Sequence, residues 1–410
     1  MPRVSPRLAL LAVAATAALV ATAGPAPGAA APAGAVVTSS RPLAPGVQLS
    51  TFRVGTATGT ATGDLVAVDL ADRHVSVGLL HPPAVGAREQ VSAMTSESHA
   101  VAGVNADFFD IDESQHPGVA ATGSSDGPEI ASGRPLKAAV PNSQRFGPGL
   151  APGTSTRDVI GVGVDGRARL DSLQLAGSVI TRYGRLPLAG LNQYAVAQGG
   201  IDAFTSDWGD VSRERAVCGS DASRGAPCTT DTAEVAVRHG RVTAVGATPG
   251  AGPIAPHGTV LVGREGGAAE LRQLHVGDPV AVTHRLAGTN PIPLRFAVGG
   301  APILRDGATL PGVDAKTAAV RTGAGVSPDG RHLYLVVLDG ISATNTGLTL
   351  AELAAVLEGF GARDGVNLDG GGSSTCAVKL PGSSTVTVVN DHPGGVAERA
   401  VANGIGVFGR

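Results

Sequence analysis

Lysine and cysteine are scarce in this 410-residue sequence, and it contains no stretch of clustered basic residues. Of its 31 basic residues, just Lys137, Lys316 and Lys379 are lysines, so an anion-binding site would be built mainly from arginine. The net charge is −3, and the lack of a basic stripe argues against a nucleic-acid partner held through its phosphates. Hydrophobic residues make up 43% and charged residues 16%, which predicts a sizeable folded core.

No apolar stretch long enough to span a membrane follows the first 34 residues. Arg3 and Arg7 precede an apolar run from Leu8 to Val20, and Ala21-Thr22-Ala23 fits a signal-peptide cleavage site. This apolar run is too short for a membrane anchor, the alternative interpretation. Residues 1–34 are therefore predicted to be a signal peptide with a flexible lead-in. The mature protein is expected to be secreted or extracellular, and association with the cell surface stays open.

The sequence has three cysteines. Cys218 and Cys228 lie in a polar loop, and in an exported protein this spacing predicts a disulfide that closes the loop. A zinc site is less favoured, because no Cys-x-x-Cys or His-x-x-x-His spacing accompanies the pair. Cys376 precedes an apolar stretch and is predicted to be a small buried residue, although a nucleophilic role beside a histidine stays open.

Short alternating apolar segments, separated by Gly, Pro, Asp and Asn, predict many strands and few helices. Leu65–Leu70 and His74–Leu80 are expected to form a first hairpin. The fold class expected is α+β, a sheet-rich domain with a few helices and a β-rich inserted block. Residues 35–157 and 291–410 would form the two parts of that domain, and residues 158–290 the insertion or second lobe.

Two helices are expected, over residues 89–100 and 349–360, and the second begins with the capping-box pattern Thr349-Leu-Ala-Glu352. Each helix leads into a strand that ends in Asn-x-Asp, at Asn105-Ala-Asp107 and at Asn367-Leu-Asp369. Because side chains alternate along a strand, the Asn and Asp of each segment should share a face. Polar groups at the carboxyl ends of strands commonly line binding sites.

The most specific stretch of the sequence runs from Asp364 to Thr375 and contains three consecutive glycines after a strand. Such glycines let backbone N–H groups approach an anion, or let a ligand pass over a bare surface. The stretch has no Gly-Lys-Ser/Thr, so it is not a P-loop. Ser373 does not stand in Gly-x-Ser-x-Gly, which argues against a serine hydrolase.

Together with other segments in the same order, this stretch resembles the NAGPA-type phosphodiester glycosidases. The matching segments are Ala102–Phe109, Gly299–Gly307, Arg321–Thr322, Asp339–Gly340, Gly347–Ala354, Asn367–Ser374 and Glu398–Asn403. Members of that family often have His-Pro before Arg-Thr, where this chain has Ala319-Val320, and Arg after Asp-Gly, where it has Ile341. Both differences remove polar groups, so they leave the identity of the substrate open.

The resemblance implies a hydrolase that cuts the bond between a sugar and a phosphate carrying a second group. N-acetylglucosamine is the sugar it implies, and the compartment favours phosphate-linked wall or capsule polymers as partners. The sugar passes through an oxocarbenium-like state that needs a nearby carboxylate. Asp107, Asp339 and Asp369 are the catalytic candidates, and their roles as acid, base or nucleophile stay open.

The phosphate requires cationic groups, and arginine suits two-point contact with it. Arg321 and Arg399 are the expected clamp. Substrate-binding roles are expected for the polar and glycine residues of the matching segments: Asn105, Arg321, Thr322, Asn367, Gly370, Gly371, Gly372, Ser373, Arg399 and Asn403.

No cofactor is expected to be required. Ca²⁺ could be held by Asp107, Asp110, Asp112 and Glu113, but their spacing fits no EF-hand loop, and a solvated acidic turn is favoured. Two other functions stay open. One is a phosphodiesterase that cuts the P–O bond of the same substrates, and the other is a non-catalytic polysaccharide-binding protein of the cell surface.

Overall fold

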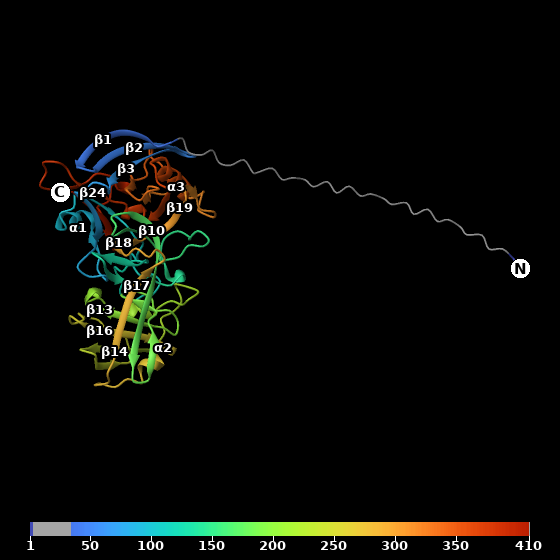
Figure 1. Ribbon diagram of the computed structural model, residues 1–410, viewed down its shortest axis with the longest axis vertical. Helices are drawn as coiled ribbons and strands as arrows, with labels where there is room; N and C mark the ends of the chain where they lie inside the picture. Colours follow the sequence, from blue (N-terminus) through green and yellow to red (C-terminus); the bar gives the residue numbers. More distant parts are fainter. Residues whose placement is uncertain (3–33, 410) are drawn as a thin grey trace. The chain divides into compact units, whose positions relative to one another are not determined.

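The computed structural model of the chain describes residues 1–2 and 34–409, and the predicted signal peptide lies almost entirely outside them. Over the described residues, three α-helices accompany 27 β-strands. The expectation of a sheet-rich fold with few helices is therefore confirmed in this broad form (Figure 1). The division at residues 158 and 290 stays a prediction.

The largest sheet has eight strands, and every neighbouring pair in it is antiparallel. Strands β22 (His332–Leu338) and β23 (Asp364–Leu368) flank β21 (Thr322–Val326), so they run parallel to each other and their carboxyl ends reach the same edge of the sheet. The strands in order are β1 (Val36–Ala44), β2 (Val47–Thr56), β3 (Gly59–Asp69), β22 (His332–Leu338), β21 (Thr322–Val326), β23 (Asp364–Leu368), β19 (Ala301–Arg305) and β20 (Ala308–Thr309).

A five-stranded sheet packs against one face of this large sheet. Val66, Leu335 and Val366 of the large sheet share a buried cluster with Val104 and Ile405 of the smaller one. Helix α3 (Leu350–Gly359) covers the other face of the large sheet, and α1 (Val91–Glu97) packs on the smaller sheet. The smaller sheet runs in the order β25 (Val386–Val388), β24 (Cys376–Lys379), β6 (Ala102–Asn105), β27 (Gly404–Gly409) and β4 (Val75–Leu80).

Helix α3 begins as its sequence predicts. The Thr349 hydroxyl accepts a hydrogen bond from the Glu352 backbone N–H at 3.1 Å, and the Glu352 carboxylate accepts one from the Thr349 N–H at 2.8 Å. The helix ends before Gly361, whose φ of +104° suits glycine. Helix α1 is shorter than expected, because Glu89–Gln90 form strand β5 and pair with β26 (Ala400–Val401).

The expected hairpin of Leu65–Leu70 with His74–Leu80 is wrong. Strand β3 pairs with β2 and β22, whereas β4 pairs with β27 in the other sheet. The alternation of the two segments was sufficient to predict strands. It did not predict their partners. Strand β22, the partner of β3, and strand β27, the partner of β4, each lie more than 250 positions farther along the chain.

The remaining strands form two further sheets. In one sheet, β9 pairs with β18 and β10 pairs with β17. In the other sheet, helix α2 (Gly266–Leu271) packs against β14 and β16. Strands β13, β14 and β16 lie at the end of the molecule away from β1–β3, and β10 and β17 run between (Figure 1). Their bounds are β7 (Glu129–Ala131), β8 (Arg134–Lys137), β9 (Asp158–Gly163), β10 (Ala168–Thr181), β11 (Gly184–Pro187), β12 (Gly190–Leu191), β13 (Ile201–Thr205), β14 (Thr232–Arg238), β15 (Arg241–Gly246), β16 (Gly258–Arg264), β17 (Ala281–Gly288) and β18 (Leu294–Gly299).

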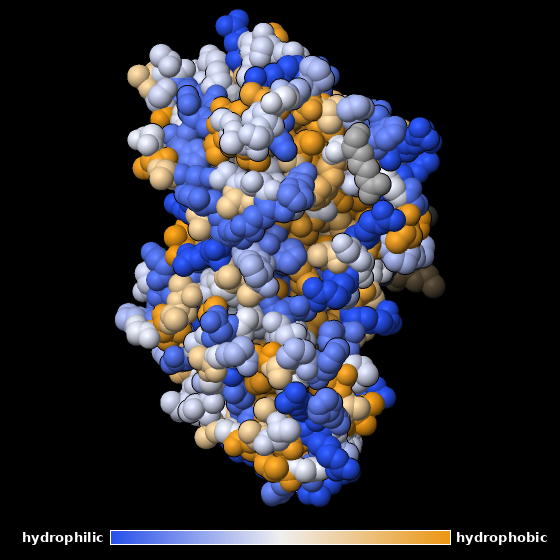
Figure 2. Space-filling view, turned by 90° about the vertical axis from the view of Figure 1, so that its left-hand side faces the viewer, coloured by the Kyte–Doolittle hydropathy of each residue, from blue (hydrophilic) through white to orange (hydrophobic). Residues whose placement is uncertain are grey.

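Two features of the described residues bear on the environment of the protein. None of their helices combines the length and apolar character that crossing a membrane requires. Cys218 and Cys228 form the predicted disulfide, and Cys376 is free and buried, also as predicted. On the face shown in Figure 2, hydrophilic and hydrophobic atoms are interspersed.

Candidate active site

Asp369 follows the carboxyl end of β23 and is held against the end of β6. Its backbone N–H donates to the Ala106 carbonyl at 2.7 Å, and the Asn105 amide nitrogen donates to the Asp369 carbonyl at 2.6 Å. The Asn105 amide oxygen accepts from the Thr322 hydroxyl at 2.9 Å and from the Thr375 N–H at 3.0 Å. Asn105 thus uses its side chain to join β6, β21 and β23, so its role is to position Asp369.

The glycine run after Asp369 is explained by close approach of neighbouring groups. A Cβ at Gly370 would lie 2.4 Å from the Val320 carbonyl oxygen, and one at Gly372 would lie 2.7 Å from a guanidinium nitrogen of Arg399. Gly371 has a φ of +61°, which suits glycine. The Gly371 N–H donates to the Val320 carbonyl at 2.9 Å. This N–H group, which was predicted to approach an anion, therefore makes a hydrogen bond within the protein instead.

Arg399 reaches across Gly372 to the segment that carries Asp369. Its Nη1 donates to the Ser373 hydroxyl at 3.1 Å. Burial raises the pKa of Asp369 to about 7, and the charge of Asp107 adds to the rise, whereas the Ser373 hydroxyl, Arg399 and the Gly370 N–H lower it. A carboxyl group with a pKa near 7 can accept or release a proton at neutral pH, which suits acid–base catalysis.

Asp369 also lines a pocket of about 410 Å³. Most of the wall is the loop that follows β6, and the wall is completed by residues from three segments farther along the chain. The lining residues are Phe108, Phe109, Asp110, Ile111, Asp112, Glu113, Ser114, Gln115, Phe146, Gly147, Arg224 and Asp369. Of the three predicted catalytic carboxylates, Asp369 is the one in this lining.

Asp107 is 3% exposed and does not line the pocket. Its carboxylate accepts from the Phe108 N–H at 2.9 Å and from the Gly127 N–H at 2.6 Å, and its own N–H donates to the Asn403 side chain at 2.9 Å. Asn403 is fully buried and donates to Glu129 at 2.8 Å. Both predicted residues therefore hold the backbone that leads into the pocket wall.

A buried lysine accompanies Asp107, and the sequence patterns did not reveal its role. Lys137 is fully buried, and its Nζ donates to the Gly127 carbonyl at 2.5 Å and to the Ala138 carbonyl at 2.9 Å. Burial lowers the pKa of Lys137, while the carboxylates of Glu129, Asp107 and Asp126 raise it. Strand alternation alone does not show which partners surround a residue, so nothing in the sequence had pointed to this group.

Asp339 belongs to a different group of residues at the same edge of the sheet. Its carboxylate accepts from the Thr62 hydroxyl at 2.7 Å and from the Asp391 N–H at 3.0 Å. Burial and the neighbouring Asp339 raise the pKa of Asp64 to about 7. Among the described residues, no hydrogen bond joins Asp339 to the Asp369 segment, and Asp339 does not line the Asp369 pocket.

Arg321 and Asn367 lie apart from the pocket. Arg321 is 6% exposed and its guanidinium donates to the carbonyls of Leu348 at 3.0 Å and Thr317 at 2.8 Å. Its neighbour Thr322 instead faces Asn105, because successive side chains of a strand point to opposite faces. Asn367 is 1% exposed, and neither atom of its amide has a partner among the described residues.

Of the acidic residues considered for Ca²⁺, Asp107 and Glu113 are already engaged in hydrogen bonds. Glu113 accepts from His116 at 2.5 Å and from Arg215, and burial raises the pKa of Asp110, next to Glu113, to about 7. Within the described part of the chain, the group of His, Cys, Asp or Glu side chains close enough to hold a metal is His116 with the disulfide-bonded Cys218 and Cys228. The Ca²⁺ site therefore gains no support.

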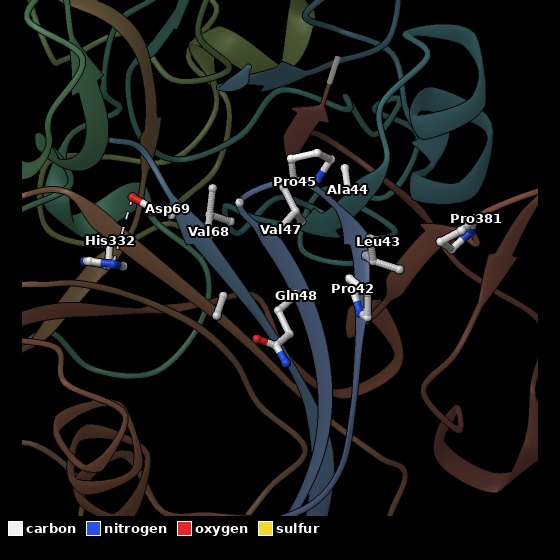
Figure 3. Close-up of a pocket in the computed structure, with 12 residues that line it drawn as sticks. Pro42, Leu43, Ala44, Pro45, Val47, Gln48, Val68, Asp69, His332 and Pro381 are labelled. Carbon is white, nitrogen blue, oxygen red and sulfur yellow. Dashed lines mark ion pairs between the residues drawn. The ribbon is translucent and has the colours of Figure 1, made fainter. Parts of the chain in front are cut away.

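Another hollow, with a volume of about 750 Å³, lies between β1, β2 and β3. Figure 3 shows Pro42, Leu43, Val47 and Val68 around it, with the ion pair of Asp69 and His332 at one side. None of the predicted site residues lines it, so its size alone does not make it the candidate site.

The fold and the Asp369 pocket define a sheet-rich protein with a carboxylate suited to acid–base chemistry. Residues 231–408 match the family model NAGPA, described as phosphodiester glycosidase. The resemblance seen in the sequence motifs is thereby confirmed over this segment. The matched segment contains Asp369 and Arg399 but not Asn105 or Asp107.

Solved structures with similar folds come from several organisms. A hypothetical protein of Synechocystis is 22% identical to this chain, with a TM-score of 0.67. The match covers 89% of this chain and 62% of the Synechocystis chain, so this chain spans less than two thirds of that protein. A Burkholderia pseudomallei protein, whose description proposes that it is exported, is 21% identical with a TM-score of 0.68, covering 91% of this chain and 96% of its own. These two share the fold.

A third structure is the catalytic domain of zebrafish N-acetylglucosamine-1-phosphodiester alpha-N-acetylglucosaminidase, auto-inhibited by its pro-peptide. It is 15% identical, with a TM-score of 0.44 over 92% of this chain and 89% of its own. No curated protein matches this chain in sequence.

Proposed function

We propose that this protein is an exported hydrolase that cleaves the glycosidic bond of a sugar-1-phosphodiester, with N-acetylglucosamine as the sugar. The observation that carries the proposal is the position of Asp369. It follows a central strand, it lines a pocket of about 410 Å³, and burial gives it a pKa of about 7. Export is supported by the disulfide and by the description of the Burkholderia relative.

The chemistry of the leaving group assigns a role to Asp369. A phosphomonoester leaves readily without a proton, so the step that needs assistance is the attack of water on the sugar carbon. Ionised Asp369 would take a proton from that water as its oxygen bonds to C1. The bond between C1 and the phosphate oxygen breaks, and its electron pair leaves with the phosphate. The products are the free sugar and a phosphomonoester.

The residues around Asp369 would keep this base ionised and in place. Arg399 and the Ser373 hydroxyl favour the charged carboxylate. Asn105 fixes the Asp369 backbone, with its own amide oxygen held by Thr322. Arg321 has no part in this proposal, because its guanidinium donates to carbonyls away from the pocket.

The test uses methyl N-acetylglucosamine-1-phosphate as a minimal diester, with products read by mass spectrometry. We expect free N-acetylglucosamine and methyl phosphate from the wild type and a large loss in Asp369→Asn. Sugar-1-phosphate and methanol would instead show a phosphodiesterase that cuts the P–O bond. In the absence of turnover, fragments of phosphate-linked wall polymers would be tested next, and binding of these fragments without cleavage would show a polysaccharide-binding protein.

A further inference from the structure

We propose that Arg224, on the loop closed by the Cys218–Cys228 disulfide, binds the phosphate of the substrate and gives the pocket its preference for anionic diesters. The inference rests on the proposed function, because it takes the Asp369 pocket as the place of reaction. Arg224 and Asp369 line the same pocket although they are far apart in the chain. No sequence motif had pointed to this arginine.

The guanidinium of Arg224 is held in one orientation by three contacts. Its Nε donates to the Gln115 side chain at 2.9 Å, its Nη1 donates to the Arg145 carbonyl, and its central carbon lies 4.0 Å from the centre of the Phe146 ring. Nη2 has no partner among the described residues, and it is not one of their buried unpaired atoms, so it is open to the pocket or to solvent. A fixed, partly free guanidinium suits an anionic ligand.

The loop that carries Arg224 is itself braced. Besides the disulfide, the Gly219 N–H donates to the Ala226 carbonyl at 2.9 Å, and the Gln144 side chain donates to the Ser220 carbonyl at 2.6 Å. A ring nitrogen of His116, which follows the lining residue Gln115, lies 2.8 Å from the Ala226 carbonyl oxygen. Arg224 would therefore meet a ligand with little loss of conformational freedom.

The pocket lining holds the carboxyl groups of Asp110, Asp112, Glu113 and Asp369, so an anionic ligand needs a cationic group there. Of the described residues that line it, Arg224 is the one with a basic side chain. Glu113 is paired with buried Arg215, which is therefore committed to that carboxylate. A phosphodiester carries a negative charge that a neutral glycoside lacks. The contact with Arg224 thus distinguishes the two classes of substrate.

The experiment measures binding and turnover in the full chain. Calorimetry with dimethyl phosphate, a diester anion without a sugar, is compared for the wild type, Arg224→Gln, Arg224→Lys and the control Ser223→Ala, which changes an exposed neighbour in the same loop. We expect Arg224→Gln to weaken binding about 10- to 100-fold. Arg224→Lys should be intermediate, because it keeps the charge but loses the planar fork, and the control should bind normally.

Turnover separates this inference from the proposed function. Arg224→Gln should raise KM for methyl N-acetylglucosamine-1-phosphate and leave that for a neutral aryl N-acetylglucosaminide unchanged. Arg224-dependent binding of dimethyl phosphate in a wild type that cleaves no diester would support the anion site and refute the proposed function. Equal binding by wild type and Arg224→Gln, no binding by the wild type, or equal loss for both substrates would overturn the role of Arg224.

Discussion

The two Asn-x-Asp segments have the same local pattern, yet the structure gives their residues opposite roles. Asp107 is 3% exposed and its carboxylate accepts two backbone N–H groups, whereas Asp369 is half-buried and lines the pocket. Asn105 makes three hydrogen bonds with its amide, whereas Asn367 makes none with described residues. One segment thus supplies a positioning asparagine and the other supplies the candidate base.

The difference shows that neighbouring strands decide what a polar residue at a strand end can do. Asn105 lies where β21 and β23 come within reach of β6, so its side chain can satisfy groups of all three. Asn367 lies inside β23, between the backbones of β19 and β21, where no described side chain reaches its amide. The following predictions test this assignment, starting with the largest expected effect.

Replacing Asp369 by asparagine should remove the base and leave the fold intact. We expect kcat to fall by about 10²- to 10⁴-fold. The free energy of unfolding should change by less than about 1 kcal/mol, because the substitution removes a charge that burial disfavours. Activity assays and urea unfolding check both parts. Asp364→Asn, at the other end of β23, is the matched control. A variant that retained a tenth of its activity would contradict the role of Asp369.

Replacing Asp107 by alanine should act mainly on stability. The N–H groups of Phe108 and Gly127 would lose a buried acceptor, and Lys137 would lose a neighbouring negative charge. We expect the free energy of unfolding to fall by about 3 kcal/mol, measured by urea denaturation. Lost turnover with normal stability would instead place Asp107 in the chemistry, and the contrast between the two segments would be wrong.

The pH dependence should report the Asp369 carboxyl. Because the base must be ionised and its pKa is about 7, kcat/KM should fall as the pH drops through 7 and level off above it. Arg399 lowers this pKa, so Arg399→Gln should raise it and move the falling limb to higher pH by roughly one unit. Rates measured from pH 5 to 9 check the shift. A limb at the same pH in both proteins would remove Asp369 as the titrating group.

The smallest effect is expected at Asn367. Its buried amide lacks partners among the described residues, so Asn367→Leu should leave turnover unchanged and stabilise the fold by about 1 kcal/mol. Asn105→Leu is the contrasting variant, and it should lose both stability and activity because three hydrogen bonds disappear. Thermal unfolding and activity assays distinguish them. Loss of activity in Asn367→Leu would return this residue to the substrate site.

Features with local signals were predictable from the sequence. The capping box of α3 and the Cys218–Cys228 disulfide depend on residues close together in the chain, and both were confirmed. Strand pairing was not predictable, as the error over β3 and β4 shows, because alternation specifies a strand without naming its partner. The same limit hid Lys137 and Arg224, whose surroundings come from distant segments.

The hydrogen bonds that join Asn105 to Asp369, Asn105 to Thr322 and Asp107 to Asn403 link residues 264, 217 and 296 positions apart. Closing such long loops is slow, so the site should be completed late in folding, and recovered activity should mark the last step of renaturation. For the same reason we expect the family-matched segment 231–408 not to fold by itself. Expressed alone, it would lack β3 and β6, expose the edges of β22 and β27, and aggregate before any site could form.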